Sequence, residues 1–513
     1  MGAQAKSYMV SAAYDYLRNV NVFFSIFCTL DAKLKNMKIF KVLATFLFGL
    51  LVYSISLNYA QALPMFSRQT GQNCVACHAG GQYPELTPYG RHFKLMAYTL
   101  GERTNVPVSV QFVGGAATST NGNNGTGQVH QSGKLEPNYL FLDVGGKITD
   151  NFGAFSQWYY AYDEQVSGKG NIPNQNQFAA DVQDWRYADR YLGSSVDIIK
   201  DFIWGASLNN YAGVTDVWNS SPMWMYPYMG STRNFSTYGL PYNTRLSAYS
   251  VHNPGYGVYG YVNQNFYGEV DLYQSGGSGA LSWMTYPASN SNPNNAPVYL
   301  QGVNPYFRFA YQSDEHNGHN WMLGVLGANI NQYSSCNTVA DSSTYKGAAP
   351  SCSGPVNSPA LSAGTVKFQD RAVDGQYQYL VDPHTVTAQA RYTKENISDP
   401  TGILYSNATN KTNSFMSKVS YVYNATYGAA LAFQNITGTA DAHYGTNAVT
   451  GAALNPNSTA WIPSIWYQPL QNLRITYQYT AFTKFNGGTI NYNGLGTNAS
   501  ANNASWLYLW LAM

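Results

Sequence analysis

Polar and apolar side chains alternate along much of this chain with a period of two residues, the spacing of a β-strand that has one polar and one apolar face. The clearest alternating segments are 140–148, 307–312, 386–393 and 473–480. Their polar positions include Arg391 and Arg474. Charged side chains suit a hydrated lumen better than a dry core, so the pattern favours a barrel whose outer face meets lipid. We therefore expect Arg391 and Arg474 to face a lumen, and Tyr392 and Tyr477 to face lipid.

The connections between such segments alternate between short and long. Short, turn-like stretches lie near 149–153, 193–196, 263–265, 314–319, 382–384, 424–426 and 468–471. Long polar stretches lie near 119–136, 164–181, 211–253, 275–303, 332–365, 397–411, 439–458 and 484–502. These connections join sixteen strands, so the sequence predicts an all-β fold, an outer-membrane β-barrel of about 16 strands over residues 105–513 with its short turns on the periplasmic side. The last strand, 506–513, resembles the C-terminal assembly signal of outer-membrane proteins, although Met513 stands where Phe is usual.

Composition agrees with a membrane barrel. Only 11% of the residues are charged and 44 are Tyr, while the net charge is +2. A water-soluble protein of this size usually has about 25% charged residues. No apolar run after residue 62 approaches the length of a membrane helix. A secreted all-β propeller or solenoid is the alternative, but the sequence has no fixed repeat period to support it.

A secretory signal begins well inside the chain. From Met37, a basic stretch, an apolar run and a cleavage site of small residues follow one another. This is the pattern of a signal peptide over 37–62, so we expect an exported mature chain that begins at Leu63. Residues 1–36 are interpreted as the product of a misplaced start codon, with a genuine N-terminal extension as the alternative.

The sequence Cys-Val-Ala-Cys-His at 74–78 is the attachment pattern of c-type haem. At this spacing Cys74 and Cys77 can add to the two vinyl groups of one porphyrin, and His78 falls on the iron as the proximal axial ligand. The alternatives are a redox dithiol or half of a zinc site. A zinc site needs four ligands, and no second Cys or His pair lies nearby in the sequence. The sequence therefore predicts one haem c and a role in electron transfer.

Two further cysteines, Cys336 and Cys352, lie in a Ser/Gly/Pro-rich stretch that is expected to form a loop. An oxidising compartment would allow them to pair, so a disulfide across this loop is a prediction that the sequence leaves open. The remaining cysteine, Cys28, would be lost with the signal peptide.

The haem-binding segment, residues 63–104, is too short to bury a core of its own. It contains one predicted helix, with Thr87 as the N-cap, Pro88 at the first position and Gly101 as the stop, so that the helix runs to Leu100. One helix cannot enclose a porphyrin. We therefore expect the barrel wall to complete the pocket, with the segment plugging the periplasmic side of the lumen.

The distal haem ligand is open. Met96 and His92 are four residues apart on the predicted helix, so both can lie on one side of it. A Met ligand raises the haem potential, which favours Met96, with His92 as the second choice. Met65 or a barrel residue remains as a further alternative.

Several stretches resemble the fused monohaem cytochrome–porins of iron-oxidising bacteria. They are 67–71, 83–91 and 93–95 around the haem motif, and 205–210 and 216–219 in the barrel. The resemblance is most specific in the N-terminal forty residues of the mature chain and looser beyond them. It implies an outer-membrane Fe(II) oxidase that passes electrons to a periplasmic cytochrome or copper protein. One departure is Ala97, where the family pattern leads us to expect Gly.

No nucleophile, phosphate-binding loop or basic run for nucleic acid is present in the sequence, so no catalytic residue is predicted beyond the haem. The expected function is an outer-membrane c-type cytochrome that oxidises extracellular Fe(II) by outer-sphere electron transfer. The alternative is a porin-like haem protein that conducts electrons for another donor or acceptor, or a channel with a haem plug. Acidic lumen residues such as Asp143 are expected to hold the cation briefly.

Overall fold

The computed structural model describes residues 64–81, 84–119, 135–161, 178–194, 197–220, 244–246, 253–275, 280–284, 300–313, 316–334 and 364–513. All of these residues belong to one compact unit, Gln61–Met513. The predictions for residues 1–36, for the signal peptide at 37–62, for Leu63 as the mature start and for pairing of Cys336 with Cys352 lie outside the described residues.

Sixteen β-strands make up most of the described chain. They are β1 (Val108–Ser119), β2 (Leu135–Lys147), β3 (Phe152–Ala161), β4 (Phe178–Leu192), β5 (Asp201–Asn209), β6 (Gly255–Val262), β7 (Phe266–Tyr273), β8 (Asn304–Gln312), β9 (His319–Tyr333), β10 (Thr365–Val381), β11 (His384–Ser398), β12 (Thr409–Tyr423), β13 (Tyr427–Gly438), β14 (Ser458–Leu470), β15 (Leu473–Lys484) and β16 (Ala504–Ala512).

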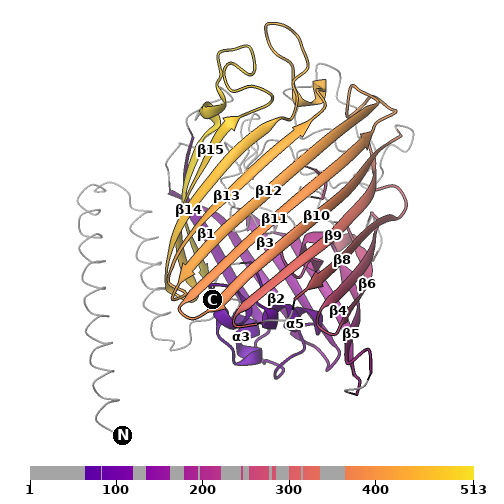
Figure 1. Cartoon of the computed structure of the whole chain (residues 1–513), viewed down its shortest axis with the longest axis vertical. Helices are drawn as coiled ribbons and strands as arrows, with labels where there is room; N and C mark the ends of the chain where they lie inside the picture. Colours follow the sequence, from indigo (N-terminus) through magenta and orange to yellow (C-terminus); the bar gives the residue numbers. More distant parts are fainter. Residues whose placement is uncertain are drawn as a thin grey trace, which may run out of the picture. The chain divides into compact units, whose positions relative to one another are not determined.

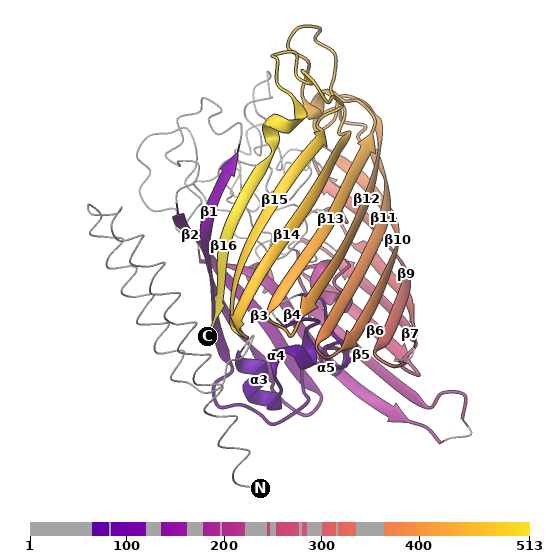
Figure 2. The ribbon, with the colours of Figure 1, turned by 60° about the vertical axis from the view of Figure 1, so that its left-hand side comes forward.

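These strands close into one antiparallel barrel (Figure 1 and Figure 2). Each strand pairs with its neighbours in sequence, and β1 completes the ring by pairing with β16, where Gln111 lies opposite Ala512. The predicted sixteen-stranded barrel is thereby confirmed. The predicted alternation of short and long connections is also found, because every short stretch named above joins two paired strands at the same end of the barrel.

The two faces of the wall follow the predicted alternation. Arg391 and Arg474 are buried on the inner face, with 2% and 1% of their surface exposed. Tyr392 and Tyr477 lie on the outer face, each 45% exposed. Both predictions are confirmed, and the wall has the polar inside and apolar outside of a barrel that spans a membrane.

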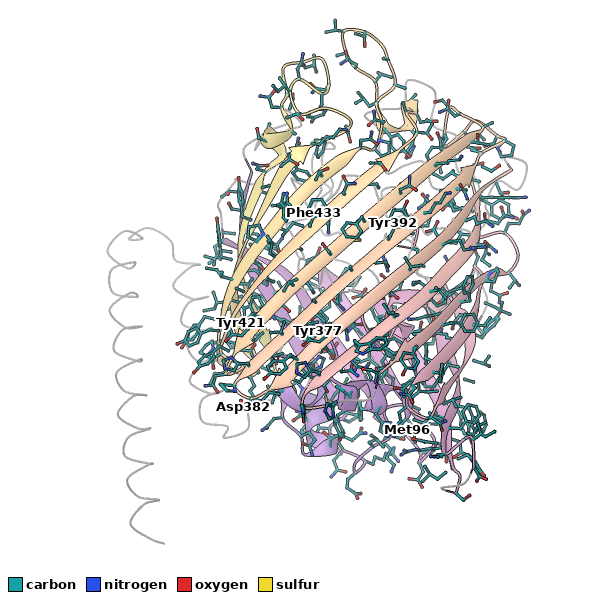
Figure 3. The ribbon with its side chains drawn as sticks, in the orientation of Figure 1. Met96, Tyr377, Asp382, Tyr392, Tyr421 and Phe433 are labelled. Atoms are coloured by element: carbon teal, nitrogen blue, oxygen red, sulfur yellow. The ribbon has the colours of Figure 1, made fainter. Side chains whose placement is uncertain are left out.

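Aromatic side chains form belts on the outer face. Tyr377 and Tyr421 lie near the end with the short turns, while Tyr392 and Phe433 lie higher on the wall (Figure 3). At the lower belt, the phenol oxygens of Tyr377 and Tyr421 lie 2.7 Å and 2.8 Å from the Nδ1 atoms of His319 and His384 on neighbouring strands. Such belts mark the interfaces between the apolar layer and water.

Three helices precede β1 at the end of the barrel that carries the short turns (Figure 2). They are α3 (Pro64–Thr70), α4 (Cys74–Cys77) and α5 (Pro88–Leu95). The predicted helix of this segment is α5, and α3 and α4 are two further short helices that were not predicted. The remaining short helices are α6 (Ala212–Thr215), η2 (Ser282–Met284), η5 (Ala442–Tyr444) and η6 (Ala499–Asn502). Among the described helices, none is long and apolar enough to cross a membrane.

Helix α5 begins as predicted and ends earlier than predicted. The side chain of Thr87 accepts a hydrogen bond from the backbone N–H of Gly90, and Pro88 occupies the first position. The helix ends at Leu95 instead of Leu100, because Ala97 and Tyr98 adopt left-handed backbone angles with φ of +55° and +59°. This turn carries the buried Tyr98 ring onto Phe66 of α3, with the ring centroids 5.5 Å apart.

The left-handed angle of Ala97 explains why Gly is expected at this position. Ala97 is fully buried, and a left-handed angle costs a non-glycine residue roughly 1–2 kcal/mol. We expect Ala97→Gly to raise the free energy of unfolding of residues 64–104 by about 1 kcal/mol. Proteolysis of this segment in the intact barrel, followed over a urea series, measures the change.

The matched control is Ala79→Gly, since Ala79 is also buried in this segment but has no left-handed angle. This substitution should lower the same free energy, because Gly gains freedom in the unfolded chain. Equal effects of the two substitutions would contradict the explanation by backbone strain.

Candidate haem-binding segment

The sequence Cys-Val-Ala-Cys folds as the single helical turn α4. Residues three apart in a helix lie on the same side, so Cys74 and Cys77 share one side of this turn. The chain then leaves the helix in an extended conformation at His78, whose backbone N–H donates to the carbonyl of Cys74 at 2.8 Å. His78 pairs with Leu86 in an isolated β-bridge. The two thiols and the imidazole of the motif are thus contiguous.

Cys74 is buried and Cys77 is partly buried at one end of the barrel. Cys74 is 3% exposed, and its backbone N–H donates to the side-chain carbonyl oxygen of Gln471 at 3.2 Å. Its Sγ lies 3.7 Å from the backbone carbonyl oxygen of Gln471, which is in the connection from β14 to β15. Burial raises the pKa of the Cys77 thiol to about 11. The Cys77 thiol is therefore protonated at neutral pH in this packing.

Helix α5 packs directly on the motif through Gly90. A Cβ atom at Gly90 would lie 2.1 Å from the carbonyl oxygen of Cys77, so only glycine allows this approach. The contact fixes the start of α5 beside the second cysteine. The sequence places Gly90 in the predicted helix but does not indicate that Cys77 packs against it.

Helix α5 and its C-cap residue Met96 present one face that is not buried. Gly90, Arg91, Phe93, Lys94 and Leu95 are buried. The residues left open are Pro88, Tyr89, His92 and Met96. Burial raises the pKa of the Tyr89 phenol, and the nearby Cys77 thiolate charge raises it further, so Tyr89 lies close to the motif. His92 and Met96 therefore both lie on this open face, and Met96 is at the end of the barrel with the short turns (Figure 3).

The surroundings of the three candidate distal ligands differ. Burial lowers the pKa of His92, and the nearby Arg190 lowers it further, while Asp201 opposes the shift. Met96 packs against the apolar cluster that includes Leu95 and Ile203. Met65 is fully buried in α3, which makes it the least accessible of the three.

This donor set fits a c-type haem. Two thiols on one side of a helical turn, an imidazole next to the second thiol, and an open face with both an imidazole and a thioether are the groups that haem attachment and ligation need. The described residues, this segment included, contain no cluster of three His, Cys, Asp or Glu side chains that could hold a metal ion.

The segment is tied to the barrel wall around most of the ring. The contacts reach β2 through Gln69 and Lys147, β4 through Tyr98 and Asp184, β6 through Leu95 and Tyr259, β9 and β10 through Arg91 with Asn320 and Gln378, and β12 through Glu85 and Lys418. The Arg91 guanidinium donates at 2.6 Å and 2.9 Å to its two partners. Because these partners lie on strands around the ring, they hold residues 64–104, called the plug below, against the inner face at one end of the barrel.

The ion pair between Glu85 and Lys418 is the most deeply buried of these ties. Both side chains are fully shielded from solvent, and the Lys418 ammonium donates to Glu85 Oε1. Burial raises the pKa of the Glu85 carboxyl, and the charge of Lys418 opposes this shift. This pair was not predicted from the sequence. The one feature that points to it is a lysine at a lumen-facing position of β12.

A segment of the connection from β5 to β6 folds into the lumen and meets the plug. Trp218 is 1% exposed, and its Nε1 donates to Gln312 at 3.0 Å. The amide of Asn219 donates to the carbonyl of Pro84 in the plug. Leu95 and Trp218 belong to one apolar cluster. The lumen is thus filled from the wall side as well as by the plug.

Arg308 on β8 holds this inward segment in place. Its guanidinium lies 2.8 Å from a carboxylate oxygen of Asp374, 3.6 Å from Asp216 and 5.2 Å from the centre of the Trp218 ring. Burial alone would raise the pKa of Asp216, but Arg308 and hydrogen bonds from Ser220 and Trp218 hold this pKa below its ordinary value. Asp216 is therefore ionised and acts as the acceptor of the network.

Asp143 faces the lumen as expected, and its oxygens already have partners. They accept hydrogen bonds from Ser109 at 3.1 Å, from Gln111 at 2.8 Å and from Gln157 at 2.8 Å. A carboxylate with three donors is well satisfied. Its surroundings support a structural role in the wall more directly than cation binding.

Scans against protein-family models and against curated proteins found no match to this sequence. Among solved structures, the chain is similar to OmpF of Salmonella typhi in complex with daunomycin, with 12% identity, a TM-score of 0.43, and coverage of 79% of this chain and 97% of that one. It is also similar to the outer membrane channel DcaP of Acinetobacter baumannii, with 11% identity, a TM-score of 0.42, and coverage of 79% and 96%. An anion-selective porin from Comamonas acidovorans has 8% identity, a TM-score of 0.39, and coverage of 79% and 98%. The barrel of this chain is established by its own strand pairing.

The Glu85–Lys418 pair can be tested by a double-mutant cycle. Lys418→Met or Glu85→Leu alone leaves a buried charge without its partner, so each should destabilise the plug by about 3–5 kcal/mol. The double variant should lie within about 1 kcal/mol of the wild type, because neither charge remains. Proteolysis of residues 64–104 over a urea series measures the three changes. Lys394→Met, on the outer face of β11, is the control, and additive single effects would contradict the pairing.

Proposed function

We propose that this protein is an outer-membrane c-type cytochrome that oxidises extracellular Fe(II) and passes the electrons through one covalently bound haem to a periplasmic electron carrier. The observation that carries this proposal is the haem attachment sequence at 74–78, folded as one helical turn inside one end of a closed barrel. The proposal agrees with the resemblance to the fused cytochrome–porins of iron-oxidising bacteria.

The barrel supports an assignment to the outer membrane of a Gram-negative cell. Such barrels have short periplasmic turns and longer outer loops. The plug is at the end with the short turns, which we therefore assign to the periplasm. Strand β1 begins at that side and β16 ends there, as an even number of strands requires. A carrier in the periplasm would then meet the plug directly.

The chain's own groups would have defined roles. Cys74 and Cys77 would form the two thioether bonds, and His78 would be the proximal axial ligand. A c-type haem, when bound, supplies a one-electron acceptor that Fe(II) can reduce and that a periplasmic carrier can re-oxidise. Gly90 keeps α5 in contact with the motif, and the ties to the wall hold the motif at a fixed depth. No acid, base or nucleophile is needed for such a transfer.

The competing function is a channel with a haem plug, or a conduit for another donor. The plug is bound to β2, β4, β6, β9, β10 and β12, and the Trp218 segment lies above it. A plug fixed on so many sides opposes the passage of solutes. It therefore favours electron transfer through the plug over diffusion past it.

The proposal predicts a covalent haem that Fe(II) reduces. Mass spectrometry of the mature protein should find one haem on a peptide that contains Cys74 and Cys77. In outer-membrane vesicles kept under argon at acidic pH, Fe(II) added outside should reduce this haem. The variant with both cysteines replaced by Ala is the control and should show no signal. Thiols at both positions in the mature protein, or a haem that stays oxidised in excess Fe(II), would overturn the proposal.

The distal ligand can be assigned by comparing the two candidates on the open face of α5. If Met96 is the ligand, Met96→Ala should lower the reduction potential, because a thioether favours the ferrous state, and should slow oxidation of Fe(II). His92→Ala should leave both unchanged. A spectroelectrochemical titration of the two variants measures the potentials. An unchanged spectrum and potential in Met96→Ala would move the assignment to His92.

A further inference from the structure

The connection between β4 and β5 forms a hairpin with an apolar tip. Leu192 and Ile198 are 66% and 92% exposed, and Tyr191 and Ile199 are also exposed. The other short connections carry mainly polar residues, such as Asn424 and Thr426. Exposed aliphatic side chains grouped in this way are a mark of an interaction surface.

This hairpin is longer than the other short connections at its end of the barrel. Tyr187 and Trp204 pair on the outer face of β4 and β5, with ring centroids 5.8 Å apart. Leu192 lies five residues beyond Tyr187, which corresponds to about 17 Å along an extended strand. The hairpin accordingly projects from the end of the barrel in both views (Figure 1 and Figure 2).

The base of the hairpin adjoins the open face of α5. Arg190 and Asp201 form a bidentate ion pair there, with both N–O distances at 2.7 Å. His92 of α5 is within electrostatic reach of both side chains. Ile203, the next inward-facing residue of β5, packs against the apolar cluster that includes Leu95 and Met96. The hairpin is therefore continuous with the surface where the haem motif is open.

Charge on the hairpin is nearly balanced. Its described part has three acidic residues and two basic ones, a net charge of −1; they are Asp189, Arg190, Asp197, Lys200 and Asp201. Asp197 is bound within the turn, where the backbone N–H and the hydroxyl of Ser194 donate to it at 2.7 Å and 2.9 Å. Arg190 and Asp201 neutralise one another. Little charge is left to attract a partner over a distance, so apolar contact must supply the binding.

We propose that the hairpin tip, formed by Leu192, Ile198 and Ile199, is the docking surface for a soluble periplasmic electron-carrier protein that approaches through an apolar patch around its own redox centre. This inference rests on the proposed function and names the surface through which the electron leaves. Electron transfer between two proteins needs close approach of their centres. Because the tip lies beside the open face of α5, a carrier bound to the tip is held next to that face.

Two other occupants fit less well. Membrane lipid would need the tip to lie against the outer wall, but the hairpin projects past the end of the barrel (Figure 1 and Figure 2). A second copy of the chain would meet this barrel through the outer wall, whereas the tip projects past the end of that wall. A soluble carrier is the partner that arrives from this side.

The test uses the full haem-loaded protein in a lipid nanodisc and two soluble probes, azurin and a soluble cytochrome c. Ile198→Asp should raise the Kd of the carrier about tenfold, as expected for loss of one central apolar contact. With the haem first reduced by ascorbate, re-oxidation by the same carrier should slow by a similar factor. The Kd of the wild type should change little between 50 and 500 mM salt. Re-oxidation by ferricyanide, which needs no docking, should be equal in both proteins.

Ile490→Asp is the matched control, since Ile490 is 75% exposed in the connection from β15 to β16 at the opposite end of the barrel. It should leave all values unchanged. Equal binding by Ile198→Asp and the wild type, or no binding of either probe by the wild type, overturns the inference. A change in the number of chains per nanodisc in Ile198→Asp would assign the tip to a second copy and also overturn it. A wild type without covalent haem would overturn the proposed function, while the binding measurement would still decide the docking surface.

Discussion

The whole structure depends on the pairing of its first strand with its last. Inside lipid, a backbone N–H or C=O group without a partner costs several kcal/mol, so a sheet that spans a membrane cannot have an open edge. The register of β1 against β16 removes that edge, from Gln111 opposite Ala512 to Ser119 opposite Ala504. Once the ring is closed, alternate side chains of every strand must enter one lumen. The polar residues of the chain therefore meet there, and a plug can find partners on every side.

The plug shows how a segment without its own core can be held in one conformation. Its helices are short, and helices of seven, four and eight residues are not stable alone in water. The wall supplies what is missing: a cation for Glu85, amides for Arg91 and a phenol that donates to the carbonyl of Leu95. Each of these partners lies on a different strand. The position of the haem motif is consequently set by the barrel more than by the sequence near it.

Local patterns predicted the barrel well because its determinants are local. The period of two placed Arg391 and Tyr392 on opposite faces, and turn chemistry located the connections and hence the number of strands. The start of α5 after its N-cap Thr87 could also be predicted, because an N-cap acts within one turn of the helix. The end of this helix was not, since Ala97 and Tyr98 turn left-handed in order to bury a ring on Phe66.

The parts of the site that sequence reasoning missed depend on distant residues. The pair of Glu85 and Lys418 joins positions 333 residues apart, and nothing near either residue indicates the other. The inward fold of the Trp218 segment likewise depends on Arg308 of another strand. The contact between Gly90 and Cys77 is short in sequence, yet it becomes visible only when both helices are in place. By contrast, the Cys-x-x-Cys-His spacing is read directly along the chain, and haem attachment at this sequence stays a prediction.

The burial of Cys74 carries a consequence for the order in which the protein is made. In the closed barrel its sulfur faces the β14–β15 connection and only 3% of the residue is accessible, so an enzyme has no approach to it. Any covalent chemistry at this thiol must therefore be finished while the chain is still unfolded in the compartment through which it passes. Closure of β1 on β16 then seals the product in. Under the proposed function, attachment of the haem would therefore have to precede closure of the barrel.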